Sequence, residues 1–147
     1  KNYKLILSEV RRNSSSKVIY HKSLSYYENI MEHRWAQDRG YDSSLFINER
    51  EEVCETSFAN IFFVRNGEIF TPTISSGLLK GTMRGYILES YKVKEDVISF
   101  KDIDTYDEVF ISNSLMGVRN VSSINNVKFN KDDKTKLILR DLKKIGF

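Results

Sequence analysis

One lysine, Lys22, lies in the middle of an otherwise apolar and aromatic segment, V-I-Y-H-K-S-L-S-Y-Y (residues 18–27). We expect a buried strand end at 18–20 and, after the lysine, a packed helix whose start includes Tyr26 and Tyr27. Burial disfavours the charged form of an amine, so a lysine at this junction would have a lowered pKa and could form a Schiff base. The alternative is a lysine that extends its ammonium group to the surface along its apolar stem.

A second candidate is the carboxylate Glu55, which lies in V-C-E-T-S-F-A-N-I-F-F-V between apolar residues typical of strands. A carboxylate in such a place is costly unless it has a partner. It could face a cationic group, such as a protonated ring nitrogen. It could also point outward at the end of the sheet and meet water or an arginine.

Two further segments could bind an anion. In L-L-K-G-T-M-R-G (residues 78–85), Gly81 precedes an expected helix. Free N–H groups at a helix N-terminus attract phosphate, and a glycine allows its close approach. In F-I-S-N-S-L-M-G-V (residues 110–118), a buried strand ends in small polar residues that could complete a phosphate site. The alternatives are an ordinary helix start capped by Thr82 and a plain β-turn.

The composition fits one domain with one core and excludes several classes of protein. The chain has 147 residues and a net charge of 23 − 20 = +3, with the charges interspersed, which gives no reason to expect nucleic acid as a partner. No apolar run approaches the length of a membrane span. The single cysteine, Cys54, excludes an intrachain disulfide and indicates a cytoplasmic setting. His21 and His33 do not form a metal-ligand pattern with it, so we expect no metal site.

Periodicity and turn residues predict an α/β or α+β fold. The expected strands are 3–11, 18–20, 45–47, 53–55, 59–64, 68–71, 97–100, 108–112, 118–124 and 127–129. The expected helices run from Lys22 to near Gly40, from 82 to 91, and from a cap at Asp132 or Asp133 to the end, with a short helix or turn at 101–106. Asn66-Gly67 predicts a tight hairpin.

Five motifs stand in order along the chain: H-K-S-L-x-Y, then E-T-S-x-A-N-I-F with its glutamate 33 positions after the lysine (55 − 22 = 33), then T-P, G-T-M-R-G and F-I-S-N-S-L-M-G-V. From about Tyr3 to about Phe129, this order and spacing resemble the large C-terminal domain of the fold-type IV pyridoxal-phosphate enzymes. That family contains branched-chain and D-amino-acid aminotransferases and 4-amino-4-deoxychorismate lyase. The resemblance implies the D-amino-acid aminotransferase-like fold, a mixed and strongly curved sheet flanked by helices.

The resemblance also implies a cofactor, pyridoxal 5'-phosphate, and a role for each candidate residue at its ring. Lys22 would be catalytic: it would form the Schiff base and later move the proton at the reacting carbon of an amino substrate. Glu55 would pair with the pyridine nitrogen and keep it protonated. Leu79 would pack on the ring, and Tyr26 would lie near the phenolic oxygen.

The phosphate end of the cofactor is assigned in the same way. Gly81 would open the helix, and Thr82 and Met83 would supply backbone amides to the phosphate. Ser114, together with Asn113, would add contacts to phosphate or substrate.

The segments N-S-L-M-G-V and G-T-M-R resemble the lyase more than the branched-chain enzymes. The implied reaction is elimination of pyruvate from 4-amino-4-deoxychorismate to give 4-aminobenzoate, on the route to folate. The alternatives are a branched-chain or D-amino-acid aminotransferase, which would use the same residues, and a non-catalytic truncated module.

The sequence departs from the family pattern in three places. Ser25 stands where many members have asparagine, and the turn 48–52 lacks the usual glycine. The family's smaller N-terminal domain has no counterpart, and the chain begins with Lys1. We therefore expect residues 1–147 to be one cofactor-binding domain of a longer, homodimeric protein, and to be inactive alone.

Overall fold

The computed structural model describes residues 2–16 and 22–147, with side chains from residue 26 onward in the second range. Its strands are β1 (Tyr3–Leu7), β2 (Ser43–Ile47), β3 (Val53–Thr56), β4 (Asn60–Arg65), β5 (Glu68–Pro72), β6 (Val93–Asp96), β7 (Glu108–Asn113), β8 (Gly117–Ile124) and β9 (Val127–Lys128). Its α-helices are α1 (Lys22–Gln37), α2 (Thr82–Ser90) and α3 (Asp133–Lys144), and its 3-10 helices are η2 (Ile74–Ser76) and η3 (Phe100–Thr105). The expected strand 18–20 and His21 lie outside the described residues.

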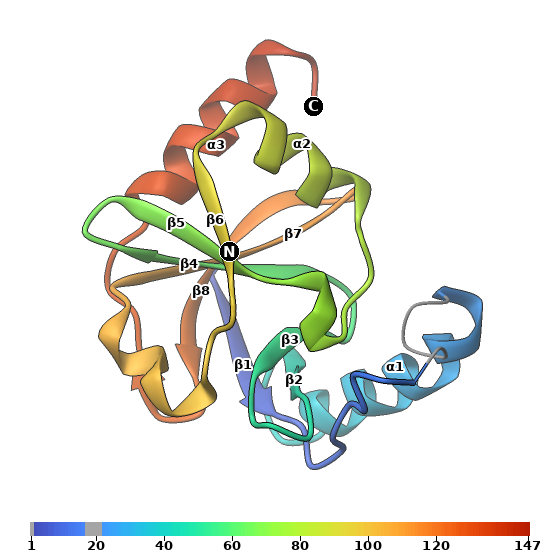
Figure 1. Cartoon of the computed structure of the whole chain (residues 1–147). Helices are drawn as coiled ribbons and strands as arrows, with labels where there is room; N and C mark the ends of the chain where they lie inside the picture. Colours follow the sequence, from blue (N-terminus) through green and yellow to red (C-terminus); the bar gives the residue numbers. More distant parts are fainter. Residues whose placement is uncertain (1, 17–21) are drawn as a thin grey trace.

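Strand β1 lies in the interior of one mixed sheet. It pairs in parallel with β2 on one side and with β8 on the other. The strand order in the described part of the chain is β3-β2-β1-β8-β7-β4-β5-β6, with β9 paired to β8. Parallel neighbours need a crossover connection, and α1 lies in the segment that joins β1 to β2. The curved mixed sheet flanked by helices (Figure 1) confirms the predicted fold class.

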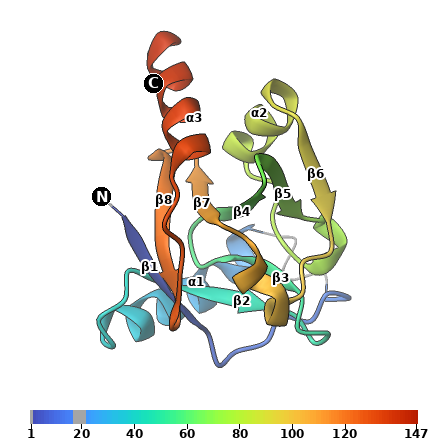
Figure 2. The same cartoon turned by 90° about the vertical axis from the view of Figure 1, so that its left-hand side faces the viewer.

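The sheet separates two apolar clusters. The larger cluster contains Leu5, Leu45 and Ile111 from the sheet and Ile103 from η3. The smaller cluster, here called the outer cluster, consists of residues of β4, β5, β7 and β8 together with α2 and α3, and Phe62 is one of its members; the two helices stand together over this face in Figure 2. The start of α2 is therefore fixed to the sheet by apolar packing.

Local turn chemistry predicted several elements correctly. Asn66 and Gly67 have φ angles of 51° and 78°, as a type I′ turn requires, and they join β4 to β5. Helix α2 begins at the expected residue. Helix α3 begins where Asp132 and Asp133 predicted, but neither caps it: the backbone N–H groups of its first turn donate to the buried carboxylate of Glu108 in β7.

The strand expected at 97–100 is wrong. The strand of this region is β6, Val93–Asp96, which pairs in parallel with β5 at the edge of the sheet. Its sequence is polar because most of its residues are exposed. The apolar residues Ile98 and Phe100 belong instead to the connection into η3, where they pack on the larger cluster.

The start of α1 is less packed than the sequence predicted. The helix ends at Gln37, close to the expected Gly40. However, Tyr26 and Tyr27 are 62% and 75% exposed in this chain. No helix in the described ranges is long and apolar enough to cross a membrane.

Candidate functional site

A β-bulge at Cys54 turns Glu55 away from the larger cluster. Val53 is opposite Ile47 and Glu55 is opposite Phe46, so two steps along β3 match one step along β2. Val53 and Ile47 both belong to the larger cluster. Directly opposite residues point to the same face, and neighbours along a strand point to opposite faces. The extra residue therefore directs Glu55 to the side of Phe46, as bulges beside functional sites commonly do.

Glu55 is buried at this position, and its two oxygens have different surroundings. Only 5% of the residue is exposed. Oε1 accepts a hydrogen bond from the backbone N–H of Leu79 at 3.3 Å. Oε2 lies 3.7 Å from Nη2 of Arg12 and has no hydrogen-bond partner among the described residues. One oxygen is thus held by the protein, and the other can accept a hydrogen bond from a ligand.

Arg12, which the sequence placed in a turn-rich loop, is the buried cation beside Glu55. It is 2% exposed, and its guanidinium carbon lies 4.0 Å from the ring centroid of Phe46. Nη2 donates to Oδ1 of Asn29 at 2.7 Å, and Nη1 lies 3.9 Å from Oε1 of Glu28. The only signal of this role in the sequence was the alternative that Glu55 meets an arginine.

The balance of burial and charge raises the pKa of Glu55 to about 7. Desolvation is the largest effect and disfavours the carboxylate. The charge of Arg12 and the N–H of Leu79 lower the pKa but do not offset the desolvation. Glu55 therefore changes its charge near neutral pH, and a second cation at Oε2 would favour the charged form.

Replacing Glu55 with glutamine should remove a pH dependence of stability from the cofactor-free protein. A carboxyl group with a higher pKa in the folded chain binds more protons when folded, so folding loses stability as the pH rises from about 4.5 to about 7. Glutamine has nearly the same shape and does not titrate. Across this range, the thermal midpoint of the parent should fall by about several degrees relative to Glu55→Gln. Parallel midpoint profiles for the two proteins would contradict the assignment.

Helix α2 begins directly after the loop that holds Glu55. Its N-cap residue is Gly81, and no side chain forms a capping hydrogen bond. Thr82 is inside the helix and exposed, and the side chain of Met83 packs in the outer cluster. The first N–H groups of a helix have no partner within it and lie at the positive end of its dipole. This arrangement supports anion binding by the backbone and excludes Thr82 as a cap.

Gly81 leaves no room for a side chain. A Cβ atom at this position would lie 2.4 Å from Oδ1 of Asn60. Overpacking of this kind costs about 1–3 kcal/mol and would shift the first turn of α2. We expect Gly81→Ala to weaken binding of pyridoxal 5'-phosphate at least about tenfold in an absorbance titration.

The matched control is Gly85→Ala in the same helix. A Cβ atom there meets nothing within 4 Å. Alanine is the better helix former by about 1 kcal/mol, so this variant should be slightly more stable and bind the cofactor normally. Equal affinities of Gly81→Ala and Gly85→Ala would refute the close approach of phosphate at Gly81.

The turn after β7 carries the remaining predicted polar residues. Asn113 uses its side chain within the protein: Nδ2 donates to the carbonyl of Phe58 at 3.1 Å, and Oδ1 accepts from the N–H groups of Leu115 and Met116 at 3.0 and 2.8 Å. Ser114 is exposed in the same turn. Asn113 therefore shapes the turn, and Ser114 is the residue open to a ligand.

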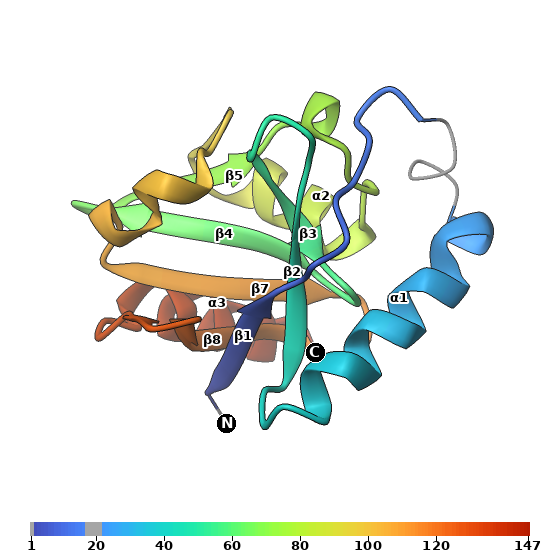
Figure 3. The same ribbon diagram turned by 90° about the horizontal axis from the view of Figure 1, so that it is seen from below.

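Lys22 is the first residue of α1, and its side chain lies outside the described residues. The N-terminal ends of α1 and α2 face the same side of the sheet in Figures 1 and 3. Tyr26 follows one turn later on α1. Among the predicted residues with described side chains, contacts join Glu55, Leu79 and, through Asn60, Gly81.

Two other reactive side chains have structural partners. Nδ1 of His33 lies 3.1 Å from Oγ of Ser43, and burial lowers the pKa of this histidine. The thiol of Cys54 donates to the carbonyl of Ser76 at 3.2 Å. Burial raises the pKa of the Cys54 thiol to about 12, so it is not poised as a nucleophile.

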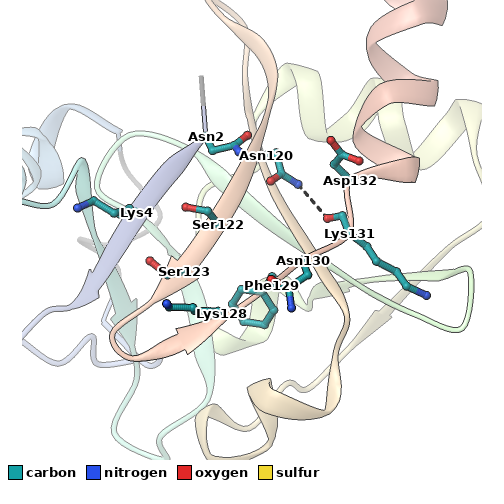
Figure 4. A pocket seen from close by; sticks show the side chains of 10 residues that line it. All are labelled: Asn2, Lys4, Asn120, Ser122, Ser123, Lys128, Phe129, Asn130, Lys131 and Asp132. Carbon is teal, nitrogen blue, oxygen red and sulfur yellow. Dashed lines mark hydrogen bonds between the residues drawn. The ribbon is translucent and has the colours of Figure 1, made fainter.

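The hollow shown in Figure 4 lies elsewhere, between β1, β8 and the start of α3. It has a volume of about 400 Å³, and Lys4, Ser122 and Asp132 are among its lining residues. A more open hollow of about 660 Å³ lies beside Trp35 and Tyr41. No predicted site residue with a described side chain lines either hollow. The site is therefore indicated by its buried polar groups and not by a large cavity.

The residues present fit pyridoxal 5'-phosphate at three points. The unpartnered Oε2 of Glu55 can accept a hydrogen bond from a protonated ring nitrogen. The uncapped start of α2 after Gly81 can hold the phosphate. Leu79, half-buried in the loop between them, can pack on the ring.

Comparison with known proteins identifies the family. The family model described as Amino-transferase class IV matches residues 1–124. A crystal structure from Legionella pneumophila, provisionally assigned as a 4-amino-4-deoxychorismate lyase, has a TM-score of 0.89 and 32% identity over 97% of this chain and 56% of that chain. The mitochondrial branched-chain-amino-acid aminotransferase 1 of Arabidopsis thaliana is 33% identical over 70% of this chain and 29% of its own length.

A third relative is known in a cofactor-bound form. The branched-chain amino acid aminotransferase of Thermobaculum terrenum in its PLP form has a TM-score of 0.78 and 26% identity over 88% of this chain and 45% of that chain. The chain thus spans about half or less of the length of two of these proteins and 56% of the third. Its relatives include a lyase and aminotransferases at similar identity, and neither group is clearly nearer. The chain belongs to the class IV aminotransferase family of pyridoxal-phosphate-dependent proteins.

Proposed function

We propose that this chain is the lysine-bearing, cofactor-binding domain of a pyridoxal-phosphate enzyme that acts on a small amino substrate. The observation that carries the proposal is the unpartnered, buried Oε2 of Glu55, held opposite the Leu79 N–H and beside Arg12. When bound, pyridoxal phosphate would draw electrons from the carbon that bears the substrate's amino group. Glu55 would hold the proton of the ring nitrogen, and the first amides of α2 would hold the phosphate.

Lys22 would be the catalytic residue. As the first residue of α1, it belongs to a regular element, which can hold a reactive group more rigidly than a free loop. Its Nζ would bind the cofactor covalently between reactions. When substrate is bound, the same amine would remove the proton from the substrate's amine-bearing carbon.

Within the family, we propose 4-amino-4-deoxychorismate as the substrate. The support is the similarity of N-S-L-M-G-V and G-T-M-R to the lyase pattern and the 32% identity with the Legionella structure across almost the whole chain. Lys22 would take the proton from the ring carbon that bears the amine. The bond from the adjacent carbon to the enolpyruvyl oxygen would then break, and the ring would become aromatic. The products would be 4-aminobenzoate and pyruvate.

An aminotransferase is the second candidate, and the 33% identity with the Arabidopsis enzyme favours it. Lys22, Glu55 and the start of α2 would then have the same positions. The difference is that Lys22 would return the proton to the cofactor side, so that the amino group could pass to a keto acid. The two activities therefore differ in the fate of one proton and not in the residues that hold the cofactor.

The full-length protein can be assayed for both reactions. We expect release of 4-aminobenzoate from 4-amino-4-deoxychorismate, and no amino transfer from branched-chain or D-amino acids to keto acids. Transfer without release would replace the lyase by the aminotransferase. Cofactor binding with neither activity would contradict both and leave a non-catalytic module.

We further propose that a smaller domain and a partner subunit complete the pocket in a full-length homodimer. The aromatic rings of Tyr26 and Tyr27, which follow Lys22 on α1, are mostly exposed in this chain. An open cofactor face of this kind admits water, and enclosed sites favour the chemistry of charged intermediates. Turnover by residues 1–147 alone should therefore be negligible beside that of the full-length protein.

A further inference from the structure

We propose that Asn60 is a positioning residue that fixes the phosphate end of the site, an inference that rests on the proposed cofactor binding. Asn60 is the first residue of β4 and is 6% exposed. Its side chain leaves the sheet toward the loop before α2. There Nδ2 donates a hydrogen bond of 2.9 Å to the backbone carbonyl of Leu79.

The same side chain limits where α2 can begin. Its Oδ1 occupies the space that a Cβ atom of Gly81 would need, at 2.4 Å. Asn60 therefore contacts the loop at two positions, the carbonyl of Leu79 and the α-carbon side of Gly81. Because the N–H of Leu79 donates to Glu55, the Leu79 backbone is held on one side by Glu55 and on the other by Asn60.

A second buried polar group lies on the same face. Ser112 of β7 is directly opposite Asn60 of β4, so both side chains point to one side of the sheet. Two residues further along these strands, Phe110 and Phe62 pack in the outer cluster with Met83 of α2. Asn60 and Ser112 thus share the face that carries α2.

Oγ of Ser112 has no hydrogen-bond partner among the described residues, although Ser112 is fully buried. Buried hydroxyl groups in folded proteins are nearly always paired. An unpaired donor on this face is independent support for an acceptor that comes from outside the chain, such as a phosphate oxygen.

Backbone amides bind an anion well only when they are already in position, because the helix cannot adjust one N–H without moving the others. Asparagine is suited to this task since it donates to the Leu79 carbonyl and carries no charge. An aspartate of the same shape could not donate. It would also place a negative charge beside the helix terminus and repel a phosphate dianion.

The test compares pyridoxal 5'-phosphate with pyridoxal, which lacks the phosphate, in absorbance titrations of the cofactor-free full-length protein. The parent should bind pyridoxal 5'-phosphate much more tightly than pyridoxal. Asn60→Ala should weaken binding of the phosphate form about tenfold. Asn60→Asp should weaken it further, and both variants should change pyridoxal binding by less than about twofold. The selectivity for phosphate would therefore decrease in the order parent, alanine, aspartate.

Asn120 provides the matched control. It is a buried asparagine of β8 whose Nδ2 lies 3.3 Å from acceptors of Val109, Lys131 and Thr135, on the side of α3. Asn120→Ala should lower the thermal midpoint without changing the selectivity. If Asn60→Ala does not fold, Gly81→Ala tests the same contact from the other side.

Equal weakening of both ligands by the Asn60 variants would show that Asn60 only stabilises the fold, and would overturn the inference. A parent that binds neither ligand would instead overturn the proposed function itself. A parent that binds both ligands equally would overturn the phosphate site at α2, and with it the role of Asn60.

Discussion

Lys22→Ala should abolish turnover by the full-length protein while leaving much of its cofactor binding intact. An amine that both anchors the cofactor and moves the substrate proton acts in every step, so its loss should reduce kcat by about four orders of magnitude or more. Glu55 and the start of α2 do not depend on the lysine. Pyridoxal 5'-phosphate should therefore still bind, but without the visible absorbance of the lysine-bound form.

The measurements are kcat for 4-aminobenzoate release and the spectrum of the loaded protein. Lys92→Ala, which removes an exposed lysine after α2, is the control and should behave like the parent. If Lys22→Ala retains the parent spectrum, another lysine holds the cofactor and Lys22 is not catalytic.

Arg12→Leu should produce the second large effect, a loss of stability that grows with pH. Removing one partner of a buried ion pair typically costs about 3–5 kcal/mol, because the other charge is left without compensation. Without Arg12, desolvation alone would act on Glu55, so its pKa should rise further above about 7. Below that pKa the carboxyl group is neutral and the cost is small, and above it the cost is large.

The second substitution Glu55→Gln should rescue much of this loss. Urea unfolding of the cofactor-free protein near pH 6 and pH 8 would give the free energies. Arg12→Leu should be most destabilised at the higher pH, and the double variant Arg12→Leu/Glu55→Gln should show no such increase. Strictly additive effects of the two substitutions at both pH values would mean that Arg12 and Glu55 are not coupled.

Arg12→Lys is expected to lie between the parent and Arg12→Leu. Lysine keeps the charge, but it lacks the planar group that stacks on Phe46 and donates to Asn29. A lysine variant as stable as the parent would show that charge alone is needed beside Glu55.

The fold could be predicted where local chemistry and tertiary structure agree. Asn66-Gly67 determines a hairpin because its left-handed backbone suits these two residues. The region around 93–106 failed because β6 is a polar edge strand, whereas the apolar residues Ile98 and Ile103 pack on the core from a loop and a 3-10 helix. Hydrophobicity reports burial, and burial alone does not distinguish a strand from a well-packed connection.

The site was only partly predictable for a different reason. Glu55 and Gly81 could be found because their types are unusual for their surroundings. Arg12 could not, since the polar residues around it are typical of a solvated turn and its partner is far away in sequence. The bulge at Cys54 also leaves no mark in the sequence, although it decides to which face Glu55 points.

Reduction with borohydride tests the central claim most directly. The full-length protein would be loaded with pyridoxal 5'-phosphate, reduced, digested and analysed by mass spectrometry. We predict one pyridoxyl modification, on Lys22, with the visible band lost on reduction. Modification of another lysine, or none at a cofactor concentration that saturates the parent, would contradict the assignment of this chain as the lysine-bearing domain.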